Sequence, residues 1–446
     1  MITDINQEMI RQRVQNAGIV GAGGAGFPTY VKFNSEAEIF LVNGAECEPL
    51  LKVDQQLAEK NAIELIKGLQ YGMKATGAKE GIIALKAKYK SAIDTLRPLL
   101  PKDIRIHILE DVYPAGDEVI TIWMATGRRV PPAALPLSVG VVVNNVQTLI
   151  NVAQAVENEA PVIDKTLTIN GMVSQPITVT VPIGTTYRQV LEMAGGATIP
   201  NPAFLNGGPM MGVLFTDLDE PIKKTTGALL VLPDDHLLIR RRTQDMTSII
   251  AMARTVCEQC CLCTELCPRH LIGHELPPHL IVRAVNYRKA DQTECSTVLS
   301  ALTCSECGIC EAYACPVEIS PMRLNQALKA QFRAEGAKYE GELRPLNPMT
   351  EYRLLPISRL ITRIDLDKMN HKAPLVDIAF MPQRVTLPLL QHIGAPAKAI
   401  VSIGDHVTRG QLIAVMEEGK LGAPLHASIS GIIQNIDDHN IVIVQE

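Results

Sequence analysis

Two cysteine-rich stretches decide how this chain folds: CEQCCLCTELCP at residues 257–268 and CSECGICEAYACP at residues 304–316. In each stretch three cysteines recur at every third position, and a further cysteine, followed by proline, lies a few residues beyond. Three thiolates at this spacing can wrap three corners of an iron–sulfur cubane, and the Cys-Pro supplies a fourth corner. The pattern therefore predicts two [4Fe–4S] clusters with eight ligands: Cys257, Cys260, Cys263, Cys267, Cys304, Cys307, Cys310 and Cys315.

The order of the cysteines also indicates which of them share a cluster. The stretches resemble those of two-cluster ferredoxins, in which the last cysteine of each run binds the other cluster. We expect one cluster on Cys257, Cys260, Cys263 and Cys315, and the other on Cys304, Cys307, Cys310 and Cys267. Structural zinc is the alternative, although zinc usually takes two close pairs separated by a longer loop. One departure is that four residues, not three, precede Cys315.

Composition indicates a reducing compartment and excludes several classes of partner. Eight of the 11 cysteines lie in cluster spacing, and the first residues, MITDINQEMIRQR, lack the apolar core of a signal peptide. The net charge of −5 carries no nucleic-acid signature. No apolar run approaches the roughly 18 residues that would cross a bilayer. The sequence predicts a cytoplasmic protein with no nucleic-acid partner and no direct membrane insertion.

Regions of different pattern predict a multidomain chain of α/β and α+β units. Residues 1–160 alternate helical stretches with short apolar β-rich runs, which is typical of an α/β domain. Residues 161–237 carry β runs, one helix and the turn-rich GGPMMG, as in a small α+β module. The cysteine stretches fall within helical segments of residues 238–345. A Pro-rich linker is expected at 346–377, and short strands with glycine turns at 378–446 indicate a compact β module.

A glycine-rich segment, GIVGAGGAGFPTYVKF at residues 18–33, carries the second chemical signal. Gly21, Gly23 and Gly26 match the G-x-G-x-x-G dinucleotide pattern, but a helical pattern precedes them where that motif needs a strand. A dense glycine loop still lets backbone N–H groups approach a phosphate, and Lys32 can supply a charge. A purely structural glycine loop is the alternative.

Polar residues follow apolar runs farther along the chain, at Asn43, Glu46 and Glu48 in NGAECEP, Tyr113 and Glu118 in VYPAGDE, and Asn144, Asn145 and Thr148 in VVVNNVQT. Amides and carboxylates at such positions can hold ribityl or ribose hydroxyls, and a tyrosine can stack on a ring. Each segment alone is more often an ordinary turn or cap. Only their combination favours a nucleotide site.

In this order GAGGAGFPTYVK, NGAECEP, YPAGDE and VVVNNVQT resemble the flavin- and NADH-binding domain of the complex I flavoprotein subunit and of Rnf complex C subunits. The resemblance implies non-covalently bound FMN, with NADH as electron donor. The FMN contacts it implies are Gly21, Gly23, Lys32, Asn43, Asn144, Asn145 and Thr148. The residues it places along the flavin and nicotinamide cleft are Glu46, Glu48, Tyr113, Asp117 and Glu118. It makes Glu118 and Glu46 the catalytic candidates.

The remaining regions extend this resemblance. Residues 161–237 resemble a soluble-ligand-binding β-grasp (SLBB) module, and the cysteine block resembles the two-cluster, ferredoxin-like helical domain of Rnf C subunits. Residues 378–446 resemble a barrel-sandwich hybrid, which lies at the amino end in Rnf C subunits and at the carboxyl end here. This order is similar to that of the cobalamin reductases of propanediol-utilisation microcompartments.

That similarity implies an NADH-dependent reductase acting on a corrinoid. Electrons would pass from NADH through FMN and two [4Fe–4S] clusters to cob(III)alamin, giving cob(II)alamin or cob(I)alamin for reactivation of a B12-dependent diol dehydratase. It implies an adenosyltransferase and shell proteins as partners, and a place inside a bacterial microcompartment.

Two alternatives remain open. One is an electron-entry subunit of an Rnf-type membrane ion pump. The other is a non-catalytic iron–sulfur relay, which is favoured by Ala22 and Ala45, because the complex I family usually carries arginine and an acidic residue there.

Overall fold

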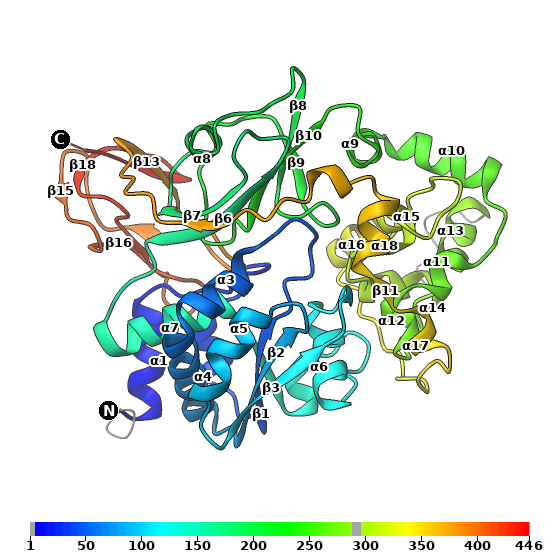
Figure 1. Cartoon of the computed structure of the whole chain (residues 1–446), viewed down its shortest axis with the longest axis horizontal. Coiled ribbons are helices and arrows are strands. Elements are labelled where there is room, and N and C mark those ends of the chain that lie inside the picture. Colours follow the sequence, from blue (N-terminus) through cyan, green and yellow to red (C-terminus); the bar gives the residue numbers. More distant parts are fainter. Residues whose placement is uncertain (1–4, 288–295, 446) are drawn as a thin grey trace.

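Four units follow one another along the chain in the computed structural model, which describes residues 5–287 and 296–445. Figure 1 shows the amino-terminal unit in blue and cyan, a green β module above it, cysteine-rich helices on one side and red carboxyl-terminal strands on the other. The predicted mixture of α/β and α+β units is therefore confirmed.

The amino-terminal unit is built on a parallel four-stranded sheet of order β3-β2-β1-β5. Its strands are β1 (Ile39–Gly44), β2 (Glu80–Lys86), β3 (Ile104–Leu109) and β5 (Val141–Asn145). Alternate residues of a strand point to opposite faces, and both faces of β1 are covered, with Phe40 and Val42 in one core and Ile39 and Leu41 in another. Carboxyl ends of parallel strands meet at one edge, so Asn43 lies beside Asn145 in register.

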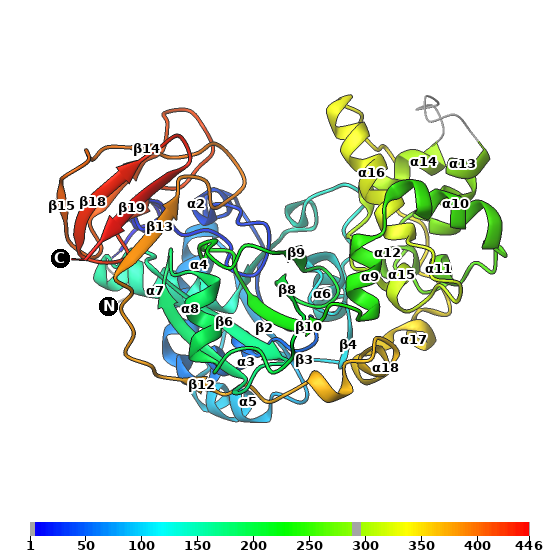
Figure 2. The same cartoon turned by 90° about the horizontal axis from the view of Figure 1, so that it is seen from above.

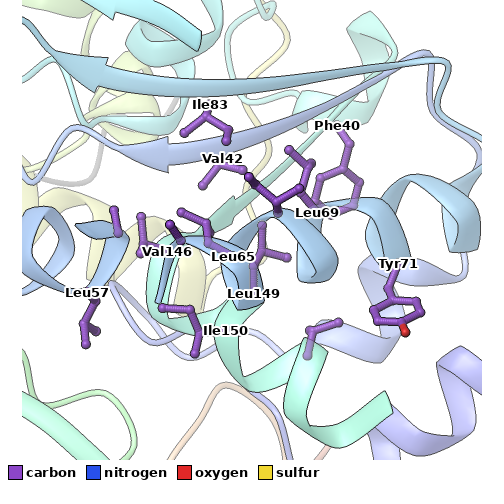
Figure 3. Packing of buried hydrophobic residues seen from close by; sticks show 14 of the residues in the cluster. Phe40, Val42, Leu57, Leu65, Leu69, Tyr71, Ile83, Val146, Leu149 and Ile150 are labelled. Atoms are coloured by element: carbon purple, nitrogen blue, oxygen red, sulfur yellow. The ribbon is translucent and has the colours of Figure 1, made fainter. Parts of the chain in front are cut away.

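Helices cover this sheet unequally. Phe33 of the short α2 (Thr29–Phe33) and five longer helices share the core of Phe40 and Val42: α1 (Gln7–Asn16), α3 (Val53–Lys60), α4 (Ala62–Thr76), α5 (Lys90–Leu96) and α7 (Val146–Asn158). Figure 3 shows Leu65 and Leu69 of α4 packing between the sheet and Leu149 of α7. Helix α6 (Glu118–Thr126) covers the opposite face through Val119, Ile120 and Ile122. The short α2 follows the glycine loop.

The green module, which corresponds to the predicted β-grasp module and is also called by that name below, is a six-stranded sheet of order β12-β7-β6-β10-β8-β9. Its strands are β6 (Asp164–Gly171), β7 (Ile177–Pro182), β8 (Pro202–Asn206), β9 (Val213–Phe215), β10 (Ala228–Pro233) and β12 (Leu375–Val376). Helix α8 (Tyr187–Met193) packs on it through Tyr187, Val190 and Leu191. A capping box at Thr186 and Gln189 fixes where this helix begins.

The cysteine-rich unit consists of helices, and Figure 2 shows them grouped at the end of the molecule opposite the carboxyl-terminal strands. The helices are α9 (Leu237–Thr243), α10 (Met246–Val256), α11 (Leu262–Glu265), α12 (Pro268–Leu271), α13 (Pro278–Tyr287), α14 (Ser296–Leu299), α15 (Ile309–Ala312) and α16 (Pro321–Ala334). Ile249, Val282 and Leu324 bring α10, α13 and α16 into one small core.

The segment expected as a linker, residues 346–377, forms ordered elements instead. It contains α17 (Thr350–Arg353), β11 (Leu355–Pro356) and α18 (Ile357–Arg363) before β12. Strand β11 pairs with β4 (Val112–Tyr113) of the amino-terminal unit, and β12 pairs with β7 of the green module. These elements are too short for a periodic signal in sequence, and neighbouring units supply the burial that stabilises them.

The carboxyl-terminal unit has two small antiparallel sheets, β13-β19-β18-β15 and β14-β16-β17. Their strands are β13 (Arg384–Pro388), β14 (Lys398–Ala399), β15 (His406–Val407), β16 (Leu412–Val415), β17 (Leu425–His426), β18 (Gly431–Ile436) and β19 (Asn440–Val444). Ile183, next to β7, is buried in their shared core and joins this unit to the green module. Over the part of the chain that is described, no helix is long and apolar enough to cross a membrane.

A glycine at the α4–α7 crossing gives a stability prediction. A Cβ on Gly68 would lie 1.9 Å from the carbonyl oxygen of Leu149. Helix propensity alone favours alanine by about 1 kcal/mol, but the backbone clash should outweigh it and lower the free energy of unfolding by about 1–3 kcal/mol. Denaturant unfolding checks this, with Gly227→Ala as control because its nearest atom, on Leu51, is 3.7 Å away. A stabilised Gly68→Ala protein would contradict the packing.

Candidate flavin and iron–sulfur sites

The glycine loop lies against the carboxyl edge of the parallel sheet. The backbone N–H of Ala22 donates to Thr148 Oγ1 at 3.0 Å, at the start of α7. Gly23 approaches Asn145 so closely that a Cβ would lie 2.8 Å from Asn145 Nδ2, whereas a Cβ on Gly24 would meet nothing within 4 Å. Residues 23–25 are exposed. The loop is thus anchored at one end and leaves backbone free to face a ligand.

Two buried charged residues that the sequence analysis did not single out support this loop. Lys165 of β6 is 3% exposed, and its Nζ donates to the carbonyl oxygen of Ala22 at 2.8 Å and to Gln147 Oε1 at 2.9 Å. Burial lowers the pKa of Lys165 to about 8, while the charge of Asp54 opposes that shift. Asp54 accepts from Asn145 Nδ2 at 2.8 Å. An isolated lysine and aspartate carry no sequence signal, because only the docking of β6 on the loop gives them a role.

Asparagines at the ends of β1 and β5 present amide groups at the same edge. Asn43 Nδ2 donates to the carbonyl oxygen of Gly116 at 2.9 Å, and Asn43 Oδ1 accepts from the N–H of Ala45 at 3.2 Å. Asn144 is 5% exposed, and its Nδ2 is buried without a hydrogen-bond partner within residues 5–287 and 296–445. A buried unpaired donor is costly. It fits a site whose ligand brings the missing acceptor, as an isoalloxazine or ribityl chain does.

Lys32 and Glu118 face each other beside this edge. Lys32 Nζ lies 3.8 Å from Glu118 Oε1, and the Glu118 side chain is 42% exposed. Lys32 also donates to the carbonyl oxygen of Val143 at 2.8 Å, which fixes its direction. Asp117, the residue before Glu118, caps α6 by accepting from the N–H groups of Val119 and Ile120. Of the two predicted catalytic carboxyls, Glu118 is the one open to solvent.

Glu46, unlike Glu118, is enclosed by its surroundings. Its Oε1 accepts from the N–H of Val53 at 2.6 Å, and its Oε2 is buried without a partner. Burial, and secondly the charge of Asp54, raises the pKa of Glu46 to about 8. Glu46 is therefore largely protonated at neutral pH, so it can donate a hydrogen bond and does not repel a ligand's negative charge.

Two residues predicted along the flavin cleft are engaged with other units. Glu48 accepts from the N–H groups of Met210 and Met211 at 2.9 Å, and so binds the GGPMMG turn of the β-grasp module. Tyr113 is 1% exposed, and its hydroxyl donates to the carbonyl oxygen of Cys307 at 2.7 Å. A ring so enclosed has no free face for stacking. We correct its expected stacking role to one of packing the two units together.

The eight cysteines line two separate cavities. One cavity is lined by Cys257, Cys260, Cys263 and Cys315, and the other by Cys267, Cys304, Cys307 and Cys310. The last cysteine of each stretch thus joins the other stretch, as expected from two-cluster ferredoxins. Burial, followed by repulsion from neighbouring thiols, raises the pKa of Cys263 to about 12. Such a group of thiols fits a cationic iron cluster, which supplies the charge that thiolates need.

One of these two groups of cysteines contacts the amino-terminal unit directly. We call Cys267, Cys304, Cys307 and Cys310 the proximal quartet. Besides Tyr113, which binds Cys307, Arg269 contacts Asp117, with Nη2 at 2.8 and 3.0 Å from the two carboxylate oxygens. The distal quartet, Cys257, Cys260, Cys263 and Cys315, has Cys257 and Cys315 packed in the core of α10, α13 and α16. Sequence offered no sign of the Asp117–Arg269 pair, since 152 positions separate its members.

Comparisons with known families define the class of protein. Family models match the Nuo51 FMN-binding domain at residues 14–154, the SLBB domain at 166–214, a 4Fe–4S dicluster domain at 256–320 and the RnfC barrel sandwich hybrid domain at 364–446. The chain is a flavin and iron–sulfur protein, so the predicted FMN and two [4Fe–4S] clusters are confirmed. The dicluster match sets the zinc alternative aside.

Relatives narrow the class to one family. Cobalamin reductase PduS of Salmonella typhimurium (strain LT2) is 60% identical over 441 residues, which are 99% of this chain and 97% of the relative. Cobalamin reductase PduS of Citrobacter freundii is 60% identical over 438 residues, 98% of this chain and 97% of the relative. The C subunit of the Na(+)-translocating ferredoxin:NAD(+) oxidoreductase complex of Acetobacterium woodii is 34% identical over 60% of each chain. The chain belongs to the cobalamin reductase PduS family.

The glycine loop gives a prediction about flavin binding. Gly23→Ala should displace the Asn145 amide and weaken FMN binding by about tenfold or more, since a misplaced buried hydrogen-bonding group costs about 1–3 kcal/mol. FMN released from the purified, reconstituted protein measures the effect. Gly227→Ala adds the same methyl group outside the glycine loop, where the nearest atom, on Leu51, is 3.7 Å away, and is the matched control. Equal FMN occupancy in both variants would contradict the role of the Gly23–Asn145 contact.

Glu46 gives a prediction about pH. Its carboxyl has a pKa of about 8 in the folded protein and 4.5 as the ordinary value. Between these values the folded state binds more protons than the unfolded state, so the Glu46 contribution to stability falls as the pH rises. Glu46→Gln should remove about 1–3 kcal/mol of that decline between pH 5 and pH 8.

Denaturant midpoints across this pH range provide the measurement for Glu46. Glu36→Gln, at an exposed position, is the control and should keep the wild-type slope. Parallel slopes for wild type and Glu46→Gln would show that Glu46 is ionised in the folded protein.

Proposed function

We propose that this chain is an NADH-dependent reductase that delivers electrons to a corrinoid. Membership of the cobalamin reductase PduS family supports the substrate class. In the reaction one NADH gives two electrons and one proton, and two cob(III)alamin molecules each gain one electron to become cob(II)alamin. A second one-electron reduction gives cob(I)alamin, the nucleophile that an adenosyltransferase needs to restore the coenzyme of a diol dehydratase.

The contact between the flavin domain and the proximal quartet carries this proposal. Tyr113 binds the backbone of Cys307, and Asp117, next to Glu118, binds Arg269. The protein therefore holds its flavin-binding edge and one set of cluster ligands in direct contact, without a partner chain. When bound, FMN accepts a hydride and releases electrons one at a time to one-electron iron–sulfur centres.

The chain's own residues hold and orient these groups. The exposed backbone of the glycine loop, with Lys32, holds the FMN phosphate, while Thr148 and Lys165 keep the loop in place. Asn43, Asn144 and Asn145 offer amides to the ribityl chain and ring. Glu118 faces the nicotinamide side and Glu46, largely protonated, forms the enclosed wall. Glu48 and Tyr113 fix the neighbouring units and so position this edge.

Partners and location follow from the same family. We propose an adenosyltransferase as the consumer of the reduced corrinoid and shell proteins of a bacterial microcompartment as the surroundings of the enzyme. Corrinoid reduction close to a diol dehydratase would shorten the path of an unstable product. Co-purification of the tagged chain with shell proteins checks the location without depending on activity.

Anaerobic reconstitution tests the function. NADH should bleach both flavin and cluster absorbance of the isolated chain, and hydroxocobalamin should then be reduced. Cys307→Ser, in the proximal quartet, should keep the bleaching of flavin by NADH but lower corrinoid reduction by about 100-fold or more, because loss of even an outer partner of a metal site costs 10–100-fold. Cys295→Ser changes a cysteine outside both cysteine-rich stretches and is the matched control.

The outcomes separate the alternatives. Bleaching without reduction of hydroxocobalamin would favour the electron-entry subunit of a membrane ion pump, which needs its partners. Failure of NADH to bleach the flavin would favour the non-catalytic relay. Equal corrinoid reduction by Cys307→Ser and Cys295→Ser would contradict a path through the proximal quartet.

A further inference from the structure

A further cavity, distinct from the two that the cysteines line, lies directly beside the distal quartet. It has a volume of about 420 Å³ and is lined by residues from α11, α12 and α13 and from the segment that leads into α17. Cys261 and His279 line both this cavity and the one formed by the distal quartet. A molecule seated there is separated from the distal thiols by single side chains.

The wall of this cavity is polar and contains charges of both signs. Arg344 lies 2.5 Å from Glu275, and Arg353 lies 3.1 Å from Glu265. All four of these residues also line the cavity. The wall therefore contains both guanidinium donors and carboxylate acceptors.

The two histidines on this wall differ in how they are held. His279 is fixed at the start of α13, because its N–H donates to Thr264 Oγ1 and its ring Nδ1 lies 2.6 Å from that same oxygen. The Nδ1 of His270 is buried, and none of the described residues gives it a hydrogen-bond partner. A buried polar atom without a partner is costly, and a ligand with a donor or acceptor at that position removes the cost.

The chemistry of the wall matches the edge of a corrinoid. Primary amides, which surround a corrin ring, both donate and accept hydrogen bonds, and the phosphodiester of the nucleotide loop pairs with guanidinium groups. A cavity of about 420 Å³ holds part of so large a molecule and leaves the remainder outside. A shallow seat suits a substrate that must be released after receiving an electron.

We propose that this cavity, between α11, α13 and the segment before α17, seats the edge of the corrinoid that receives electrons from the distal cluster. The inference rests on the proposed function and adds to it the place where the substrate binds. It also assigns an order: the proximal quartet contacts the flavin domain, and the distal quartet contacts the acceptor cavity. Each electron reduces one cobalt centre, with no bond to the protein required.

Two variants of the loaded holoprotein test the site. Leu280→Trp fills the cavity from a position that is 37% exposed. Arg344→Ala removes a guanidinium whose side chain is 59% exposed. Arg359→Ala, at an exposed position on α18 that lines a different cavity, is the matched control. Equilibrium dialysis measures binding of hydroxocobalamin without turnover, and EPR of the reduced protein reports whether both clusters are intact.

Arg344→Ala removes a charged hydrogen-bond partner and Leu280→Trp takes up the space of the ligand, so each should weaken hydroxocobalamin binding by about tenfold or more. Arg359→Ala should bind as the wild type does, and all three should retain NADH-driven reduction of ferricyanide. Wild-type affinity in Arg344→Ala and Leu280→Trp with intact EPR signals would overturn the site. If Leu280→Trp loses a cluster, Arg344→Ala alone decides.

Binding and reduction fail independently in this design. A wild-type protein that binds hydroxocobalamin but does not reduce it overturns the proposed function and leaves the cavity to be judged by the variants. A wild-type protein that reduces hydroxocobalamin while both variants bind it normally overturns the cavity alone.

Discussion

The contact between Asp117 and Arg269 is the constraint on which the arrangement of this molecule depends. Both side chains are largely enclosed, at 11% and 15% exposed, and removal of one partner from such a pair costs about 3–5 kcal/mol. Asp117 also caps α6, while Arg269 lies two residues after a cysteine of the proximal quartet. One ion pair therefore ties the start of α6 in the amino-terminal unit to the loop that carries Cys267, and fixes their separation.

Other units are joined by buried lysines that donate to backbone carbonyl groups. Lys165 of the β-grasp module binds the carbonyl oxygen of Ala22 in the glycine loop. Lys224 of the same module binds Gly18 at 2.7 Å and Pro424 of the carboxyl-terminal unit at 3.2 Å, and burial lowers its pKa to about 7. The β-grasp module thus contacts both the glycine loop and the carboxyl-terminal unit, and holds these two parts of the chain together.

Local patterns in the sequence were sufficient where a motif includes its own geometry. The cysteine spacing predicted two clusters. The glycine loop with its downstream polar segments favoured a nucleotide site, and only the resemblance to a known family implied FMN; the family matches confirm both cofactors. Residues 346–377 gave no such signal, because β11 and β12 are two-residue strands stabilised by sheets of other units. Tyr113 was misjudged for a related reason: its ring is enclosed by a unit nearly two hundred residues away.

The sequence by itself determined the two clusters and the order of the domains, since thiolate spacing and strand periodicity act over a few residues. It indicated FMN through the resemblance of its glycine loop and downstream segments to a known family. Tertiary structure alone decided which cysteine quartet touches the flavin domain and which lies beside the polar cavity. It also decided that Glu46 is enclosed and largely protonated, while Glu118 remains open. These properties depend on burial and on contacts between distant segments, and no local pattern specifies them.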